Sequence, residues 1–600
     1  MKSEHLSRPL WHYQCIENVC KKIEITGNNT TSLLSLSACR IICGRGIIWP
    51  EPSDINGFNS ILVNIDVKRV RYYDAYRKTV VGDFIMRKVN AFKNYLRGFK
   101  PNMSRLVRRR KIQIFVQDLQ STNDMSLTLE TKEGYELSIW TSAFSVDITL
   151  KADNYFGIRN GFETLEQLIT FNDISNEVQI VGGAWIRDSP AYPYRGILVD
   201  TSRNYITKSA IMKTIEAMGM SKLNTLHWHI TDQQSFPYVS RTWPNMTRYG
   251  AYSPSKVYTA ADIKEIKEFG IYHGVRVVPE LDAPAHVGEG WQWIGDDALI
   301  CYRAEPWTSY CPVPPCGQLN PISNRVFEIL EGLYKDMLTD FEPDVFHMGG
   351  DQVNKNCWQT SEVIKRWANT TESKLSDADF IHLWASFQKR AYEKLKLAND
   401  GKDIPAILWS SNLTMKQNLN QLDNKNYIIQ NWMGKDDHQT IKDLLENDFR
   451  VIFSHYDVHY LDCGFGSHVG SGNNWCSPYN DWRKIYDYSP LRVINNLNLQ
   501  SKRHLIFGGE AVLWSESVDS SSLDSRLWPR AAALAGRLWT EAENRLSDVE
   551  SRVYWHRERL VDRGIFAGHL APEWCLQNQA LCRWPYEVMD DSIYYLNDSK

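Results

Sequence analysis

The chain has 600 residues, which is long enough to bury a large core and to hold one large domain together with a smaller one. Its 68 basic and 71 acidic side chains give a formal net charge of -3, so the composition argues against a global electrostatic attraction to nucleic acid. The apolar runs fall short of about 18 residues, and the sequence therefore predicts no membrane span. Two counts exceed ordinary usage, the 22 Trp and the even number of 12 Cys.

The cysteines lie in local groups without the C-x-x-C spacing of a zinc ribbon, a pattern that favours disulfide bonds. In the first group, Cys15 and Cys20 face Cys39 and Cys43, and the spacing leaves their pairing open. The other expected partners are Cys311 with Cys316, Cys463 with Cys476, Cys575 with Cys582, and the two that remain, Cys301 and Cys357.

Asn-x-Ser/Thr acceptor sites also indicate the secretory pathway. They begin at Asn28, Asn29, Asn102, Asn245, Asn369, Asn412 and Asn597. We therefore expect a secreted or lysosomal glycoprotein. Residues 1–13 contain no apolar stretch of the kind found in a secretory signal, so we expect that a signal was trimmed or that the gene model is incomplete.

Changes of pattern along the chain predict three regions. Residues 1–50 are rich in cysteine and predict a short disulfide-rich segment. Residues 51–190 predict a small α+β domain, because strand-like runs precede a helix-like stretch over residues 155–169. The strand-like runs lie at residues 61–67, 112–116, 135–139 and 146–150. The basic run RLVRRRK at residues 105–111 indicates a solvated loop, with a nucleic-acid or heparin patch as the alternative.

Residues 191–600 repeat an apolar strand, a polar or aromatic strand end and a helical stretch eight times. The expected strands are 196–200, 225–230, 275–281, 345–348, 406–410, 427–430, 451–454 and 505–514. Strands that alternate with helices pair in parallel, and this number closes a (β/α)8 TIM barrel, so the predicted fold class is α/β. A doubly wound open sheet is the rival, weakened because no G-x-G-x-x-G follows a strand.

Functional side chains of such a barrel lie where its strands finish, and nearly every predicted strand ends in a carboxylate, Arg, His or Trp. These candidates are Arg203, Asp232, Asp282, His286, Asp351, Gln352, Trp409, Trp432, Tyr460, Asp462, Trp514 and Glu516. Sugars present apolar faces to aromatic rings and hydroxyl groups to carboxylates and guanidinium groups, so the set predicts a carbohydrate ligand.

Plainer interpretations apply to several of these residues. A single Trp more often fills a core than binds a ligand. His227 and His229 share one strand face and could hold a metal, but no third ligand is evident and we expect none. Glu280 and Asp282 are expected to be structural, with a direct sugar contact left open.

Five motifs carry a resemblance to a known family: RGILVDTSRNY at 195–205, LHWHITD at 226–232, FHMGGD at 346–351, DCGFG at 462–466 and RLWPRAA at 526–532. With them, the chain resembles the β-N-acetylhexosaminidases of glycoside hydrolase family 20 from about Cys15 to Cys582, including the cysteine pairs. It looks in particular like the insect members that degrade chitooligosaccharides.

The resemblance implies an exo-acting, retaining enzyme that removes terminal N-acetylglucosamine or N-acetylgalactosamine, with the 2-acetamido oxygen of the substrate as nucleophile. Asp351 would orient the acetamide and Tyr460 would donate a hydrogen bond to its oxygen. The substrate-binding residues implied are Arg203, Asp232, His286, Trp409, Trp432, Asp462, Trp475, Trp514 and Glu516. No cofactor and no metal are implied, and relatives of this fold form homodimers or heterodimers.

The chain departs from the family pattern at its centre. Gln352 stands where the family has the Glu that protonates the leaving oxygen, and an amide has no proton to transfer. Gly536 also replaces a usual Glu. Val313, in CPVPPC, replaces an acidic group typical of chitin-degrading relatives, which argues against a preference for long linear oligomers.

These departures leave three hypotheses. The first is a β-N-acetylhexosaminidase with impaired activity on natural glycosides, acting on chitooligosaccharides or glycoconjugates. The second is a catalytically silent glycan-binding or adhesion protein on the same barrel, which Gln352 favours. The third is an inactive partner subunit of an active homologue.

Overall fold

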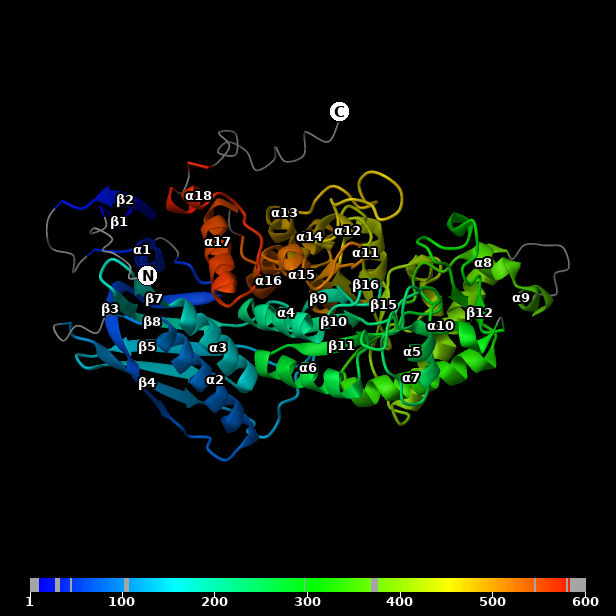
Figure 1. Ribbon diagram of the computed structural model, residues 1–600, viewed down its shortest axis with the longest axis horizontal. Helices are drawn as coiled ribbons and strands as arrows, with labels where there is room; N and C mark the ends of the chain where they lie inside the picture. Colours follow the sequence, from blue (N-terminus) through cyan, green and yellow to red (C-terminus); the bar gives the residue numbers. More distant parts are fainter. Residues whose placement is uncertain are drawn as a thin grey trace.

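The computed structural model describes residues 10–26, 33–43, 46–101, 107–295, 297–367, 376–543, 546–578 and 581–582. In Figure 1 a sheet with its helices occupies one end of the elongated molecule, and a barrel with surrounding helices occupies the rest. No helix in these ranges is long and apolar enough to cross a membrane.

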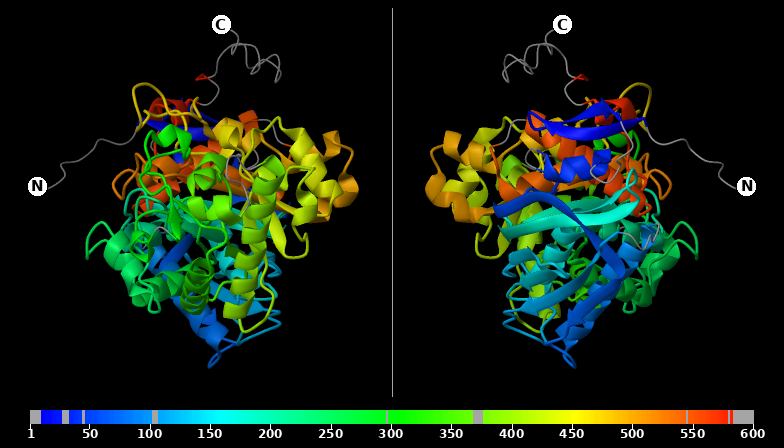
Figure 2. Two further views of the ribbon diagram at one scale, coloured as in Figure 1. Left: turned by 90° about the vertical axis from the view of Figure 1, so that its right-hand side faces the viewer. Right: turned by 90° about the vertical axis from the view of Figure 1, so that its left-hand side faces the viewer.

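The N-terminal segment is a hairpin of β1 (Trp11–Ile16) and β2 (Val19–Glu24) joined to α1 (Leu36–Ile42). The Ser35 side chain caps α1 by accepting a hydrogen bond from the backbone of Ala38 at 3.1 Å. Disulfides Cys15–Cys43 and Cys20–Cys39 fasten the helix to the hairpin. The guanidinium of Arg40 donates to the carbonyl of Leu576, so this segment contacts the C-terminal helix, as the views in Figure 2 also show.

All the cysteines are paired. Besides the two N-terminal bridges, the disulfides are Cys301–Cys357, Cys311–Cys316, Cys463–Cys476 and Cys575–Cys582.

The small domain is a mixed sheet with the order β3-β4-β6-β5-β8-β7. Its strands are β3 (Asp54–Tyr73), β4 (Arg110–Gln117), β5 (Tyr135–Thr141), β6 (Ser145–Lys151), β7 (Ile169–Asn172) and β8 (Glu177–Asp188). Alternate side chains such as Tyr135, Leu137 and Ile139 are buried, and this face packs on α2 (Val80–Gly98) and α3 (Tyr155–Gln167). Side chains that alternate with these, such as Trp140, are on the opposite face, and Trp140 is exposed.

The predicted loop over residues 105–111 is wrong in part. Arg110 and Lys111 begin β4, because the alternation of the strand extends back to them, with Lys111 opposite Ser145. Arg109 forms a buried ion pair with Glu177 at 2.5 Å. Residues 105 and 106 lie outside the described residues.

Eight parallel strands close the barrel in the order β9-β10-β11-β14-β15-β16-β17-β18, as predicted. They are β9 (Tyr194–Asp200), β10 (Thr225–His229), β11 (Arg276–Glu280), β14 (Phe346–His347), β15 (Ala406–Trp409), β16 (Tyr427–Asn431), β17 (Arg450–Phe453) and β18 (Ile506–Leu513). The longer helices outside them are α4 (Lys208–Met220), α6 (Ala260–His273), α7 (Asn324–Phe341), α10 (Asp377–Ala398), α11 (His438–Glu446), α16 (Arg530–Thr540) and α17 (Leu546–Asp562).

Shorter elements fill the connections. The helices are α5 (Pro244–Gly250), α8 (Lys355–Thr360), α9 (Glu362–Trp367), α12 (Tyr456–His459), α13 (Trp482–Asp487), α14 (Pro490–Asn496), α15 (Leu523–Leu527) and α18 (Glu573–Gln577), and the small strands are β12 (Leu299–Ile300) and β13 (Gln318–Leu319). The eightfold strand–helix repeat is broken once, because only two short 3-10 turns join β15 to β16. That connection is rich in Ser, Asn and Asp, which favour turns over helices.

The barrel interior is apolar at one end and polar at the other. Buried side chains including Tyr194, Val278, Ile407 and Ile452 form one small cluster around the strand starts. Further along the strands the interior side chains are His227, Glu280, His347 and Glu510, all fully buried. The polar part therefore lies toward the carboxyl ends of the strands, where sites of this fold are built.

Candidate active site

A glycine turn after β14 carries Asp351 and Gln352 to the carboxyl end of the barrel. Gly349 and Gly350 have φ values of 62° and 89°, and a Cβ atom at Gly349 would lie 1.9 Å from the Asp282 carboxylate. The backbone N–H of Gly350 donates to that carboxylate at 2.8 Å. Only glycine fits at 349, so this turn fixes the position of Asp351.

His286 links the Gln352 amide to Asp232. Its Nε2 atom lies 2.9 Å from Gln352 Oε1, and its Nδ1 atom lies 3.4 Å from Asp232 Oδ1. An amide oxygen only accepts, so the imidazole is the donor. Burial alone would lower the pKa of His286, but Asp232 and Asp282 raise it to about 9. The ring is therefore charged near neutral pH and donates from both nitrogens.

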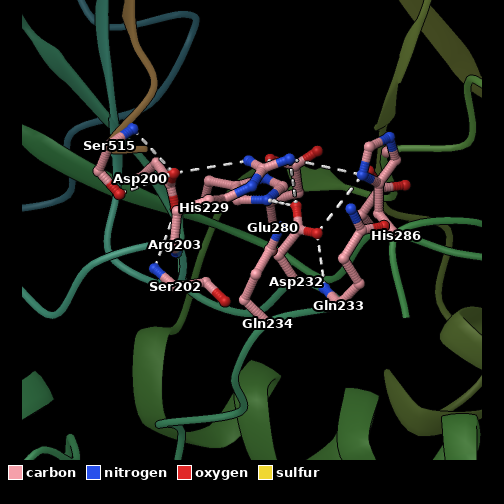
Figure 3. A network of polar contacts seen from close by, with 12 residues as sticks. Asp200, Ser202, Arg203, His229, Asp232, Gln233, Gln234, Glu280, His286 and Ser515 are labelled. Atoms are coloured by element: carbon pink, nitrogen blue, oxygen red, sulfur yellow. Dashed lines mark hydrogen bonds and ion pairs between the residues drawn. The ribbon is translucent and has the colours of Figure 1, made fainter. Parts of the chain in front are cut away.

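Arg203 lies on the other side of Asp232. Its guanidinium is 2.8 Å from Asp232 and 3.5 Å from Asp200, and Figure 3 shows it between the two carboxylates. The same group lies 4.7 Å from the centre of the Trp514 ring. The Arg203 Nε atom forms no hydrogen bond within the described ranges. The buried Arg203 guanidinium therefore has an N–H group that can donate to a ligand, and it lies beside the Trp514 ring.

Five aromatic rings that follow four of the strands gather around these groups, with Tyr460 and Trp475 both in the connection from β17 to β18. Trp514 lies 6.1 Å from Trp409 and 6.3 Å from Tyr460, measured between ring centroids. Trp475 lies 6.3 Å from both Tyr460 and Trp432. Trp409 is 2% exposed whereas Trp475 is 65% exposed, so the set runs from the barrel interior to the surface. Such a graded set of rings suits a ligand with several apolar faces.

Two carboxyl groups near the rings, those of Asp351 and Asp462, have raised pKa values. Burial raises the pKa of Asp351 to about 6, although His286 acts to lower it. Burial and the neighbouring Glu516 raise the pKa of Asp462 to about 8. Groups with such shifts cluster at functional sites, because water has been excluded from charges that a ligand would compensate.

Beneath the rings lies a buried network that the sequence interpretation missed. Glu280 is 3.0 Å from both His227 and His347, contacts His229, and accepts from the Trp409 indole at 2.8 Å. His229 in turn lies 2.7 Å from Asp232 (Figure 3). Although burial opposes it, the three imidazoles hold the pKa of Glu280 well below its usual range. The contacts follow from the register of the folded sheet, in which Glu280 is opposite both His229 and His347.

Two groups in the barrel that contain no disulfide-bonded cysteine have donor atoms close enough to share a cation. They are His227, Glu280 and His347, and Asp282, His286 and Asp351, each with ligand atoms within 4.8 Å of one another. In the second group the Nε2 atom of His286 already donates to Gln352. The expectation of a site without metal stays a prediction.

Comparison with known proteins decides the family. Residues 192–542 match the catalytic domain of glycosyl hydrolase family 20, and residues 48–168 match a domain described as beta-acetyl hexosaminidase like. The chain belongs to glycosyl hydrolase family 20. It is 44% identical to the chitooligosaccharidolytic beta-N-acetylglucosaminidases of Ostrinia furnacalis and Bombyx mori, over 96% of this chain and 96% and 95% of those proteins.

Solved structures agree on the fold. The exo beta-N-acetylglucosaminidase of Vibrio harveyi, a family 20 enzyme solved with N-acetylglucosamine, matches 93% of this chain and 84% of its own with a TM-score of 0.68 at 20% identity. The family 20 member described here is thus a glycosidase of the β-N-acetylhexosaminidase type. Its predicted site residues come together at one end of one barrel, in contacts that run from Arg203 through Asp232 and His286 to Gln352.

Proposed function

We propose that this family 20 protein is an exo-acting β-N-acetylhexosaminidase that removes terminal N-acetylglucosamine or N-acetylgalactosamine from chitooligosaccharides or glycoconjugates. The observation that carries the proposal is the position of Asp351, which is buried and follows a glycine turn that is bound to the ring-bearing strand end, since the Gly349 carbonyl accepts from the backbone N–H of Trp409 at 3.0 Å. The Trp409 ring lies 6.1 Å from that of Trp514, which lies 6.3 Å from that of Tyr460. The 44% identity to two insect enzymes named for chitooligosaccharide cleavage supports the first substrate class.

The proposed mechanism is retaining and uses no enzymic nucleophile. The acetamide oxygen of the substrate bonds to the anomeric carbon while the bond from that carbon to the leaving oxygen breaks, which gives a cyclic oxazolinium. Asp351 in its ionised form stabilises the positive charge on the acetamide nitrogen, and the Tyr460 hydroxyl donates a hydrogen bond to the attacking oxygen. Water then attacks the anomeric carbon from the face that the leaving group left, and the bond from that carbon to the acetamide oxygen breaks. The attacking water loses a proton to the solvent or to the departed leaving group, and the two inversions retain the configuration.

The remaining groups have binding roles in this proposal. Trp409, Trp432 and Trp514 enclose the N-acetyl group, while Trp475, which is 65% exposed, stacks on the next sugar. Arg203, Asp462 and Glu516 hold the hydroxyl groups of the terminal ring. Asp232 and His286 fix the side chain at position 352, since His286 contacts both Asp232 and Gln352.

Gln352 lowers the activity on natural glycosides. General acid catalysis is worth about 10²- to 10⁴-fold, or roughly 3 to 5 kcal/mol of barrier, and an amide cannot supply it. The acetamide reaction itself does not need Gln352. Substrates whose leaving groups are already acidic should therefore be cleaved best.

The presence of Gln352 also favours a second candidate, a glycan-binding protein that does not cleave its ligand. Because the Gln352 oxygen is occupied by His286, its amide N–H groups remain to donate to a glycosidic oxygen. That arrangement would hold an uncleaved glycan. An inactive subunit in a heterodimer would have the same chemistry at its site.

The proposal also includes secretion or a lysosomal location, a dimeric state, and region boundaries at residues 50 and 190. Asn412 is exposed and Asn245 is partly exposed, so both acceptor sites are open to modification. The other predicted acceptors, at residues 28, 29, 102, 369 and 597, lie outside the described residues.

The test is an assay of the purified protein on an aryl β-N-acetylglucosaminide with a good leaving group and on chitobiose, with calorimetric binding of N-acetylglucosamine alongside. Turnover of the aryl substrate with retention of configuration supports the enzyme. Binding of the sugar without turnover of either substrate favours the glycan-binding protein, and no binding at all contradicts both.

A further inference from the structure

A basic and aromatic surface lies on the small domain, at the end of the molecule away from the barrel strands (Figure 1). We define this β4 surface by Arg71, Arg108, Arg110, Lys111, Trp140 and Phe144. Trp140 is 76% exposed and Phe144 is 75% exposed, the two highest values among the large apolar side chains of the described chain. Exposed rings of this size mark interaction surfaces.

The sheet register brings part of the β4 surface into one row. Arg71 is opposite Gln113, Gln113 is opposite Asp147, and Asp147 is opposite Trp140 across β3, β4, β6 and β5. Directly opposed residues share a face, and neighbouring strands are about 4.8 Å apart, so Arg71 and Trp140 are about 14 Å apart on the outer face. The row is long enough to underlie several sugar rings.

The turn between β5 and β6 gathers the other members. The backbone N–H of Lys111 donates to the carbonyl of Phe144 at 3.2 Å, and Arg110 Nε donates to the carbonyl of Ser142 at 2.9 Å. The Arg108 guanidinium lies 5.1 Å from the centre of the Phe144 ring. Arg108 thus contacts the Phe144 ring, and backbone carbonyls of the same turn bind Arg110 and Lys111.

The positive charge of the β4 surface is only partly compensated, because Asp147 lies within the row but forms no ion pair with its cations in the described part of the chain. Among the described residues, no carboxylate forms an ion pair with Arg71, Arg108, Arg110 or Lys111, whereas nearby Arg69 pairs with Asp66 at 2.6 Å. The chain as a whole has a net charge of -3. Cations concentrated on one end of a weakly acidic protein are complementary to an anionic partner.

We propose that the β4 surface binds an acidic polysaccharide, independently of the barrel site and of its proposed activity. Exposed rings stack on the apolar faces of sugars, while Arg and Lys pair with sulfate or carboxylate groups. An anionic bilayer fits less well. Arg108 already covers the Phe144 ring, and the Asp147 carboxylate lies within the row, bound by Gln113 at 2.7 Å, where a continuous anionic plane would press against it.

The experiment measures binding of the full chain to immobilised heparin, as the sulfated polysaccharide, over a range of salt concentrations. The test variants are Arg71→Ser/Arg108→Ser and Trp140→Ala. The matched control is Lys389→Ser/Lys402→Ser, which removes two exposed cations near α10 without a described ion pair. The thermal midpoint of each variant checks folding.

The arginine double variant should weaken heparin binding and reduce the slope of log affinity against log salt by about two, one per lost cation, while the control changes neither. Trp140→Ala should weaken binding about five- to tenfold with an unchanged slope. Equal effects of the double variant and the control would overturn the proposal. So would absence of heparin binding, or preferential binding to phosphatidylserine vesicles that Trp140→Ala abolishes.

Discussion

The Nε2 atom of His286 lies 2.9 Å from the Oε1 atom of Gln352, so the amide accepts a hydrogen bond from a charged imidazole. A carboxylic acid at position 352 could bind the same donor through one oxygen and protonate a leaving group through the other. The amide keeps the first contact and lacks the second function. The site thus retains its geometry while it lacks a proton donor at this position.

The activity of the parent protein on an aryl substrate should depend on pH through Asp351. The pKa of this carboxyl is raised by burial to about 6, and only its ionised form stabilises the oxazolinium. We expect kcat/KM to fall as the pH drops through about 6. Above about pH 6 we expect no decrease from deprotonation of a general acid, because position 352 has none. A profile that falls between about pH 6 and pH 8 in the parent would contradict this assignment.

The same raised pKa makes a prediction about stability. The usual value for Asp is 3.8 and the folded value is about 6, so the folded state binds the proton more tightly and ionisation destabilises it as the pH rises between these values. Asp351→Asn should therefore raise the free energy of unfolding above about pH 7, by about 3 kcal/mol, and by much less near pH 4. Denaturant titrations at both pH values measure this, and an equal effect at both would refute it.

The Glu280 carboxylate should make a large contribution to the stability of the barrel. Glu280→Gln removes the charge shared by three imidazoles and weakens acceptance from the Trp409 indole. We expect a loss of about 3–5 kcal/mol of stability, as when a buried ionic partner is removed, and a lower affinity for N-acetylglucosamine. The control is Glu268→Gln, whose carboxylate is 66% exposed and 3.9 Å from Lys264, and which should cost less than about 1 kcal/mol. Similar losses for the two variants would disprove the role of Glu280.

The second departure from the family pattern has a packing explanation. A Cβ atom at Gly536 would lie 2.2 Å from the ring of Trp49, which is buried and donates to the carbonyl of Ala532 at 2.9 Å. Trp49 therefore occupies the space that a side chain at 536 would need. Gly536→Ala should destabilise the protein by about 1–3 kcal/mol, despite the higher helix propensity of Ala.

The control for this prediction is Gly98→Ala, because a Cβ atom at the end of α2 would contact nothing within 4 Å. That change should be neutral or slightly stabilising. In a Trp49→Ala background, Gly536→Ala should lose its destabilising effect, and thermal unfolding of the four combinations measures the coupling. Additive effects would show that the Trp49 contact is not the cause.

The barrel strands could be predicted because each is a short apolar run that ends in a polar or aromatic residue, such as the run before Trp409. The helix α2 was missed although its buried residues Val81, Ile85, Val89, Phe92 and Leu96 recur at helical spacing. The missing helix between β15 and β16 was also signalled by composition.

The site residues could be predicted as strand-end side chains, whereas their connections could not. The path from Glu280 through His229 and Asp232 to Arg203 depends on which residues of adjacent strands lie opposite one another, and a single strand does not encode that register. Likewise, the contact between His286 and the Gln352 oxygen depends on left-handed backbone conformations, with φ of 54° at both residues.

The most direct test is the turnover of chitobiose by the parent and by Gln352→Glu, with an aryl β-N-acetylglucosaminide of good leaving group measured in parallel. If position 352 is the proton-donor position of an otherwise intact site, the variant should gain at least about a hundredfold in kcat/KM on chitobiose and much less on the aryl substrate. Equal activities of the two proteins on chitobiose, with N-acetylglucosamine binding unchanged, would contradict the account.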